Sequence, residues 1–334
     1  MQKALLSRAS PTVSFAWKDL THNKPLAFDN SQIDKRLQNV LPSHSNILPH
    51  PLIPTSFLIL SDTHNFVPDP SKSQYPLNNL LSQNQKFDVL LHCGDLTQVG
   101  GSASYKKCLN FLSKVNADLK LVIAGNHDLD LDPNIAEDEE EREDHLEAIE
   151  LMTDTLAKEA GITYLTEGNH SFDLANGATL KIFVSPFTPK VGDWAFGYPR
   201  EKGEEFWEGK IDKDVDFVMT HGPMKGELDF AHGGSQGCDG LRKEVERVRP
   251  LVHCFGHIHE GYGVKVKEWE DERGNDEVEG REVRFRKAGV GDEKQEEVVK
   301  LRKGKETLVV NAAIMDKGHP TNAPWLVEVP LRGQ

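Results

Sequence analysis

The stretch Val252-His253-Cys254-Phe255-Gly256-His257-Ile258-His259 is the part of the chain on which the fold assignment depends. Its short apolar run ends at Phe255, and two histidines, His257 and His259, follow two residues apart. Side chains at i and i+2 of an extended segment point the same way, so a turn at Gly256 lets both imidazoles face one point in space. Imidazole is the commonest side-chain metal ligand at neutral pH. A lone His-x-His pair is equally consistent with ordinary surface or core histidines. Its interpretation as part of a metal site therefore depends on further metal-binding residue types elsewhere in the chain.

Outward from this stretch, apolar segments alternate with helical ones, which is the pattern of a layered α/β domain. Several of the apolar segments are continuous Val/Ile/Leu runs, as expected for strands covered on both faces. The expected strands are 57–61, 89–93, 119–124, 180–185, 217–220, 252–255, 307–312 and 325–329. Apolar residues at helical spacing over 105–115 predict a helix that packs on the sheet.

Three segments differ from this pattern. Residues 1–55 end in a Pro-rich stretch and predict an N-terminal arm or leader before a folded body over 56–330. Residues 137–150 are strongly acidic and predict the solvated start of a helix, where acids are favourable. Residues 265–305 are dense in charge and glycine, with few large apolar side chains, so we expect a charged, flexible insertion or a long solvated hairpin.

The net charge of −14 argues against a general nucleic-acid-binding surface, which needs a basic face. The four cysteines form no Cys-x-x-Cys pair, and a reducing, cytoplasmic compartment is the simplest interpretation. No apolar run approaches the ~20 residues of a membrane-spanning helix, so we expect no membrane partner. The first 18 residues carry three basic residues and no acid, which leaves a mitochondrial transit peptide as the alternative. The oligomeric state is left open.

A polar cluster follows each of five expected strands. These clusters are Asp62-Thr63-His64, Gly94-Asp95, Gly125-Asn126-His127-Asp128, His221-Gly222-Pro223 and Gly256-His257-Ile258-His259. Because ligands of open α/β sheets bind beyond the carboxyl ends of the strands, we expect the clusters to gather along one rim. Their Asp, His and Asn side chains supply oxygen and nitrogen donors suited to divalent ions such as Mn, Fe or Zn. Glycine before the polar residues, at Gly94, Gly125 and Gly256, permits a tight turn or a close backbone approach.

These five blocks, in this order, resemble the calcineurin-like metallophosphoesterase superfamily over about residues 56–330. The sequence is similar, more narrowly, to the metallophosphoesterase-domain-containing phosphodiesterases of animals and fungi. The stretches that carry this closer similarity are Thr220-His221-Gly222-Pro223, Gly237-Cys238, the run from Phe255 to Gly263, and Val310-Asn311-Ala312. The resemblance implies an α/β fold, a four-layer α/β/β/α sandwich with mixed sheets.

The resemblance also implies a dinuclear centre of two divalent metal ions, drawn from Mn, Fe, Zn, Ni or Mg. The implied ligands are Asp62, His64 and His259 for one ion, Asn126, His221 and His257 for the other, and Asp95 as a bridge between both. His127 is implied as an acid near the leaving oxygen rather than a ligand. Asp128 either orients His127 and keeps it protonated, or is an exposed acid without a role.

The implied activity is a metal-dependent phosphoesterase, a hydrolase in which metal-bound hydroxide attacks phosphorus while His127 protonates the departing alkoxide. Two cations about 3.5–4 Å apart can clamp the oxygens of an anionic ester that otherwise repels a nucleophile. The expected partner is a small phosphate-ester substrate, most simply a phosphodiester such as a cyclic nucleotide. We expect substrate choice to depend on the loops 66–76, 186–210 and 223–240, where His232 either contacts substrate or is solvated.

Two alternatives stay open. The first is a phosphomonoesterase or protein phosphatase on the same fold. The Ser/Thr protein phosphatases of the superfamily carry an Asp-Arg pair after Gly-Asp and an Arg before Gly-Asn-His, whereas Leu96-Thr97-Gln98 and Ala124 stand here. Lacking that bidentate clamp on a dianionic phosphate, the chain is a poor match to this subclass. The second alternative is a non-catalytic metal-binding scaffold, although every implied ligand and the acid histidine are retained.

Overall fold

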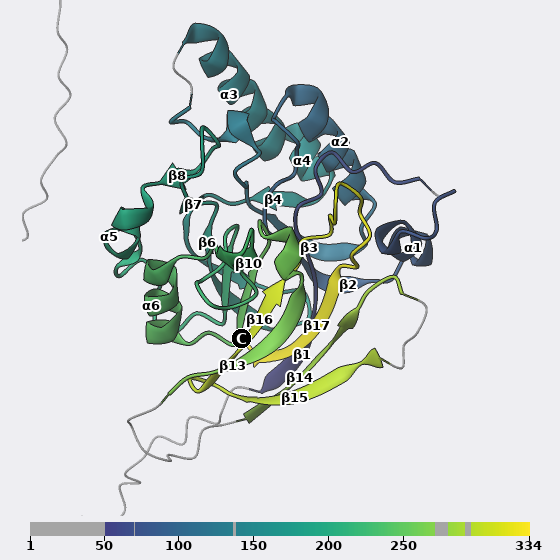
Figure 1. Cartoon of the computed structure of the whole chain (residues 1–334). Coiled ribbons are helices and arrows are strands. Elements are labelled where there is room, and N and C mark those ends of the chain that lie inside the picture. Colours follow the sequence, from purple (N-terminus) through teal and green to yellow (C-terminus); the bar gives the residue numbers. More distant parts are fainter. Residues whose placement is uncertain (1–50, 70, 136–137, 271–279, 291–294) are drawn as a thin grey trace, which may run out of the picture. The chain divides into compact units, whose positions relative to one another are not determined.

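Two mixed β-sheets form the centre of the described chain (Figure 1). The computed structural model describes residues 51–69, 71–135, 138–270, 280–290 and 295–334. The strand order is β15-β14-β17-β1-β2-β3-β4 in the first sheet and β13-β16-β12-β9-β6-β5 in the second. The expected arm over 1–55 lies outside the described residues, except for its last five residues.

The first sheet combines a parallel half with an antiparallel half. Its strands are β1 (Leu52–Leu60), β2 (Phe87–His92), β3 (Ala117–Val122), β4 (Ile162–Tyr164), β14 (Gly280–Lys287), β15 (Glu297–Arg302) and β17 (Trp325–Arg332). The strands β1 to β4 run parallel, and β17 joins β1 antiparallel. β1 starts before the expected boundary at residue 56, and it includes Pro54. This proline is tolerated because β2 pairs with β1 only from Phe57 onward.

The second sheet has a parallel centre and antiparallel edges. Its strands are β5 (Gly168–Asp173), β6 (Thr179–Ser185), β9 (Phe217–Thr220), β12 (Val252–Phe255), β13 (Gly263–Glu268) and β16 (Glu306–Asn311). The four strands β16, β12, β9 and β6 are parallel, and β13 and β5 flank them antiparallel. Parallel strands end at the same edge, so both sheets deliver the residues that follow their strands to a common side.

The two sheets bury an apolar core between them. Phe57 and Ile59 of β1 face this core, and the Phe57 ring lies 4.4 Å from that of Phe217 in the second sheet. The alternate residues Leu58 and Leu60 belong instead to the cluster under the helices. Both faces of this part of β1 are therefore covered, which explains the continuous apolar run Phe57–Leu60 in its sequence.

Helices cover the outer face of each sheet. They are α1 (Pro76–Gln83), α2 (Ser102–Ser113), α3 (Glu139–Thr153), α4 (Thr155–Glu159), α5 (Gly203–Trp207) and α6 (Asp239–Val248). Residues of α1 to α4 share a buried cluster with the first sheet, and those of α5 and α6 share one with the second (Figure 1). The predicted four-layer α/β/β/α fold is confirmed. None of the helices in the described ranges has the length and apolar character to cross a membrane.

The acidic segment begins a helix, as predicted. Asp138 caps α3 by accepting a hydrogen bond from the Glu141 backbone, and the Glu141 side chain accepts from the Asp138 backbone in return. Acidic residues of the first turn stabilise the positive end of the helix dipole. Residue 137, where the expected segment starts, lies outside the described residues.

The charged region 265–305 contains more paired structure than its composition led us to expect. β14 and β15 form an antiparallel hairpin, and β14 also pairs with β17. Val283, Phe285 and Leu301 are buried between the sheets, while Glu282, Arg284 and Lys300 are exposed. Because only alternate residues of a strand face the core, these strands need few apolar residues. The ranges 271–279 and 291–294 lie outside the described residues.

Candidate metal centre

The five predicted clusters meet at the carboxyl ends of β1, β2, β3, β9 and β12. Backbone hydrogen bonds tie the segments to one another directly. The amide of Asp62 donates to Gly94 O at 2.9 Å, and that of His64 donates to Asp95 O at 3.1 Å. The amide of Gly256 donates to His221 O at 3.0 Å, which joins the two segments of the second sheet. The rim expected from the sequence is therefore present.

One group of possible ligands contains Asp62, His64 and His259. Their ligand atoms all lie within 4.8 Å of one another. His259 Nε2 is 3.2 Å from Asp62 Oδ1, and His64 Nε2 is 3.9 Å from the same oxygen. The Asp62 carboxylate is fully buried, and both of its oxygens accept from the His257 backbone amide.

A second group contains Asp95, His221 and His257, again within 4.8 Å. His221 Nε2 lies 3.3 Å from Asp95 Oδ1 and 2.9 Å from Asn126 Oδ1, so Asn126 belongs to this group. The other oxygen of Asp95, Oδ2, lies 3.6 Å from His64 Nε2 of the first group. The Asp95 carboxylate thus presents one oxygen to each group.

The donor atoms fit a bound cation. His64 Nδ1 donates to Thr97 O at 3.0 Å, and His221 Nδ1 donates to Cys93 O at 2.9 Å. In the neutral rings, each Nε2 then carries a lone pair that faces carboxylate or amide oxygens. Lone pairs that face one another in this way repel unless a positive charge lies between them. Carboxylate, imidazole and amide groups are suitable ligands for divalent transition metals.

Two of these histidines are neutral, as this arrangement requires, whereas His221 holds a proton. Burial lowers the pKa of His64, and it lowers the pKa of His257 to about 4, so both rings are neutral at pH 7. Burial acts in the same direction on His221, but Asp95 and Asp62 outweigh it and raise the pKa of His221 to about 9. A bound divalent cation would replace the proton that His221 otherwise carries.

The backbone around these residues is strained. Eleven non-glycine residues in the described ranges have positive φ angles. Seven of them surround this site: Asp62, His64, Asn65, Asp95, His232, His257 and Lys317. Left-handed conformations cost non-glycine residues free energy and cluster where function requires an exact side-chain direction.

Two of the predicted glycines are required by close packing. A Cβ atom on Gly125 would lie 2.3 Å from Asp95 Oδ1, and one on Gly256 would lie 2.0 Å from Asp62 Oδ2. Any other residue would displace the carboxylates that line the centre. The interpretation of these glycines as points of close backbone approach agrees with the structure.

His127 lies beside the first group and is held on three sides. Its Nδ1 donates to Gln98 O at 2.7 Å, and its backbone amide donates to Asp95 Oδ1 at 2.9 Å. Its ring centroid is 4.8 Å from that of His64 and 4.0 Å from that of Trp194. Trp194 was not singled out from the sequence, although it falls within the loop 186–210.

Asp128 has a different role from the one expected. It is fully buried rather than exposed, and its carboxylate accepts from the backbone of Leu96, Thr97 and Gly125. The Thr97 hydroxyl donates to it as well. The Nδ1 of His127 bonds to Gln98, so Asp128 does not orient that ring. Burial and the nearby Asp95 raise the pKa of Asp128 to about 7, against the opposing effect of the backbone donors. We interpret Asp128 as a positioning residue that clamps two ligand-bearing loops.

A cavity of about 380 Å³ opens onto the two groups. Its lining comprises the predicted residues Asp95, Asn126, His127, His257 and His259, together with His232, Glu260, Asp316, Lys317 and Gly318. Of the added residues, only His232 had been considered as a substrate contact. Lys317 and its neighbours lie outside the three loops expected to choose substrate, and no motif distinguishes them in the sequence.

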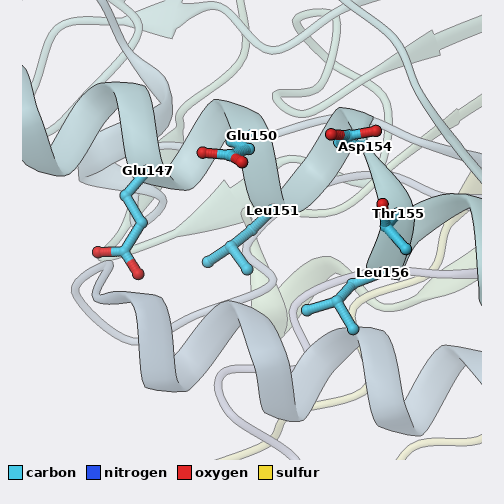
Figure 2. Close-up of a pocket in the computed structure, with 6 residues that line it drawn as sticks. All are labelled: Glu147, Glu150, Leu151, Asp154, Thr155 and Leu156. Atoms are coloured by element: carbon cyan, nitrogen blue, oxygen red, sulfur yellow. The ribbon is translucent and has the colours of Figure 1, made fainter.

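Another cavity, of about 230 Å³, lies on α3 and α4 and shares no lining residue with this centre (Figure 2). Figure 2 shows Leu151 and Leu156 pointing toward the neighbouring helix, and Glu147, Glu150 and Asp154 also line this cavity. Glu147 already pairs with Lys106 at 3.6 Å. The acidic residues that line this cavity belong to a solvated helix face, and we assign the cavity no function.

Comparison with known proteins gives the family. Residues 55–261 match the calcineurin-like phosphoesterase family. Human metallophosphoesterase domain-containing protein 1 is 32% identical over 229 residues, which are 63% of this chain and 62% of that protein. UPF0046 protein K07C11.7 of Caenorhabditis elegans is 34% identical over 183 residues, covering 53% and 58%. A probable rhamnogalacturonate lyase C of Emericella nidulans is 37% identical over 213 residues, covering 63% and 18%.

The matched segments span less than two thirds of each of these relatives. The family match itself covers more than half of the chain and includes every predicted ligand. With both donor groups assembled at the strand ends, the chain belongs to the calcineurin-like phosphoesterase family of metal-dependent phosphoester hydrolases.

Proposed function

We propose that this protein is a phosphodiesterase that holds two divalent metal ions bridged by Asp95. The observation that carries the proposal is the carboxylate of Asp95, whose two oxygens lie 3.3 Å from His221 Nε2 and 3.6 Å from His64 Nε2. One oxygen therefore serves each donor group. When bound, two such ions polarise the phosphoryl oxygens and generate a nucleophile from water at neutral pH.

The side chains of the site would hold the metal ions in position and supply a proton to the leaving group. Asp62 and Asp95 are buried and fixed by backbone amides, so their oxygens cannot turn away from the centre. The Nδ1–H of His127 is held by Gln98 O, which leaves Nε2 as the atom that can donate to the departing oxygen. Packing against Trp194 holds the ring in that direction.

The charge of the cavity favours diesters over monoesters. Among the described residues that line it, Lys317 is the only lysine or arginine. A monoester carries about two negative charges, and enzymes grip it with bidentate arginines. One lysine and two ions suit the single charge of a diester. Cyclic nucleotides are the small diesters that we propose to test first.

A side-by-side rate comparison tests this proposal. The metal-stripped protein is supplied with Mn²⁺ or Ni²⁺ and assayed on an aryl monoester, an aryl diester, and 2′,3′- and 3′,5′-cyclic nucleotides. We expect kcat/KM for the best diester to exceed that for the monoester at least tenfold. A monoester preference would replace the proposal with a phosphomonoesterase. Bound metal without hydrolysis of any ester would favour a non-catalytic scaffold.

The matched variants are Asp95→Asn and Asp118→Asn. Asp118 lies in β3 near its amino end, is exposed and pairs with Lys86, so it carries the same chemical change far from the centre. We expect Asp95→Asn to lose diester hydrolysis and Asp118→Asn to retain it.

A further inference from the structure

Two tight hairpin turns bring His232 and Lys317 to the wall of the cavity over the metal donors. The first turn, His232-Gly233, joins β10 (Phe230–Ala231) to β11 (Gly234–Ser235). The second, Lys317-Gly318, is closed by two backbone hydrogen bonds of 2.8 and 2.9 Å between residues 316 and 319. We call these two turns the turn pair.

Turn stability does not explain why His232 and Lys317 stand there. Their φ angles are 50° and 48°, and the glycines that follow have φ angles of 81° and 80°. Two-residue hairpin turns with positive φ at both positions favour Asn-Gly or Asp-Gly. A lysine at the first position adopts a left-handed backbone at a cost in stability, and a histidine does so less readily than the glycine that follows it. Such strain next to an active site is a reason to look for a role of the side chain.

The first turn is fixed to the loop that carries the metal ligands of the second sheet. The buried carboxylate of Asp229 accepts from the backbone amides of Gly226 and Gly237, which lie on either side of the first turn in the loop 223–240. Asn311 Nδ2 donates to Leu228 O at 3.2 Å and to Ile258 O at 2.7 Å, and Ile258 precedes His259. His232 is therefore held at a defined distance from the donors.

The second turn is fixed to the end of β1. The amide of Ile314 donates to Ser61 O at 3.0 Å, directly before Asp62. Asn322 donates from its backbone to Ile314 O at 3.0 Å and from its side chain to Ala313 O at 3.1 Å. Lys317 thus projects from a stable hairpin and not from a loose loop.

The chemistry of the turn pair complements a small anionic ligand. Lys317 carries the only permanent positive charge among the described lining residues, and the exposed imidazole of His232 can donate or accept a hydrogen bond. The cavity volume of about 380 Å³ is within the range of small-molecule sites. Bound ions would contact the phosphoryl oxygens that face the donor groups, so the turn pair is left to contact the remaining phosphoryl oxygen and the groups beyond the ester.

We propose that His232 and Lys317 determine substrate specificity. Lys317 binds the anionic phosphate group, and His232 hydrogen-bonds to polar groups carried beyond the ester. The enzyme therefore prefers phosphodiesters of mononucleotide size with hydrogen-bonding groups over simple aryl diesters. This inference rests on the proposed phosphodiesterase function.

The test uses His232→Asn and Lys317→Asn in the full-length, metal-loaded protein. Asparagine is the favoured residue at the first position of such turns, so both variants keep the fold while they lose the imidazole or the charge. Lys86→Asn, just before β2 at the opposite end of the sheet, and His170→Asn in β5 serve as matched controls.

Two substrates separate the two roles. For bis(4-nitrophenyl) phosphate and a cyclic nucleotide, we expect Lys317→Asn to raise KM about tenfold for both, the effect of one lost charge-assisted hydrogen bond. We expect His232→Asn to raise KM about fivefold or more for the cyclic nucleotide and less than about twofold for the aryl diester. Because these contacts are equal in ground and transition states, kcat should change less than about twofold. Calorimetric titration with adenosine monophosphate should show the same weakening.

The outcomes distinguish this inference from the proposed function. If the wild type hydrolyses both diesters and the two variants keep its KM values and its affinity for adenosine monophosphate, the turn pair has no recognition role. A fall in kcat at constant KM also overturns it. If the metal-loaded wild type hydrolyses no ester, the phosphodiesterase proposal fails, and the titration decides the inference alone: weaker binding by both variants supports it, and equal binding overturns it.

Discussion

Replacement of Asp128 by asparagine tests the clamp between the two ligand-bearing loops. Oδ2 accepts from the amides of Leu96 at 3.1 Å and Gly125 at 2.8 Å. Oδ1 accepts from the amide and the hydroxyl of Thr97, both at 2.9 Å. All of these groups are buried around a side chain with 0% exposure. In Asp128→Asn, one of the two oxygens becomes an NH2 group that cannot accept.

The cost follows from which donors lose their acceptor. If the NH2 group faces Thr97, the hydroxyl can reverse and accept from it, but the Thr97 amide is left without a partner. If it faces the other side, the amides of Leu96 and Gly125 both lose theirs. One unsatisfied buried donor costs about 1–3 kcal/mol, and above pH 7, where the Asp128 carboxyl is ionised, the loss of the charged acceptor adds about 1 kcal/mol. We therefore expect the free energy of unfolding to fall by about 2–4 kcal/mol.

The same change should loosen the centre, because the clamped loops carry Asp95 and Asn126. Loss of an outer-shell partner typically weakens metal affinity about 10–100-fold. Urea unfolding and competition with a metal-sensitive dye measure the two effects, with Asp118→Asn as the control. A stability within about 0.5 kcal/mol of the wild type, typical of neutral surface changes, together with unchanged metal affinity, would refute the positioning role of Asp128.

Three further predictions concern the metal ligands, the acid and a buried lysine. The folded-state pKa of His221, about 9, lies above its ordinary value of about 6.5, so its proton stabilises the fold fully below pH 6.5 and less as pH rises through 9. With a chelator, the melting temperature should fall between pH 6.5 and 9, and saturating Mn²⁺ should remove that fall; a flat profile with the chelator would contradict the coupling. His127→Ala should leave metal content unchanged and lower kcat about 10²–10⁴-fold, and unchanged turnover in stopped assays would exclude it as the acid. Lys120 Nζ donates at 2.9 Å to both Leu112 O and Ala160 O, so Lys120→Met should lower unfolding free energy by about 1.5–3 kcal/mol without changing kcat/KM; wild-type stability in urea would show that those carbonyls need no cation.

The central strands could be predicted because burial on both faces of a strand requires consecutive apolar residues, which are visible in the sequence. β1 and β2 contain the apolar runs Phe57–Leu60 and Val89–Leu91, β12 ends in Cys254-Phe255, and Asp62, Asp95 and His257 follow these stretches within four residues. The strands near the edge of the first sheet carry a weaker signal. In β14, the buried apolar residues are Val283 and Phe285, and three arginines, a lysine and a glutamate make up most of the rest, so average composition suggested a solvated insertion. Pairing with β17 stabilises this strand, and that partner lies more than thirty residues away in the chain.

The clustering of the candidate donor residues could be predicted because each lies within four residues of the end of a strand, where spacing along the chain restricts position in space. Lys317 and Trp194 could not, because they reach the site through loops whose path depends on tertiary contacts. For Asp128 the structure shows a buried carboxylate that accepts from backbone amides, where the sequence suggested a partner of His127 or an exposed acid. Its sequence neighbour is His127, but its hydrogen-bond partners lie one strand away, at Leu96 and Thr97.

The number of metal ions per chain tests the bridging role of Asp95 most directly. The protein is stripped with chelator, reloaded with Mn²⁺, freed of excess metal, and measured by mass spectrometry of the metal alongside Asp95→Asn. We expect two ions per wild-type chain and no more than one in Asp95→Asn, with loss of diester hydrolysis in the variant. A single ion in the active wild type, or two ions retained in Asp95→Asn, would contradict a centre in which this carboxylate joins two ions.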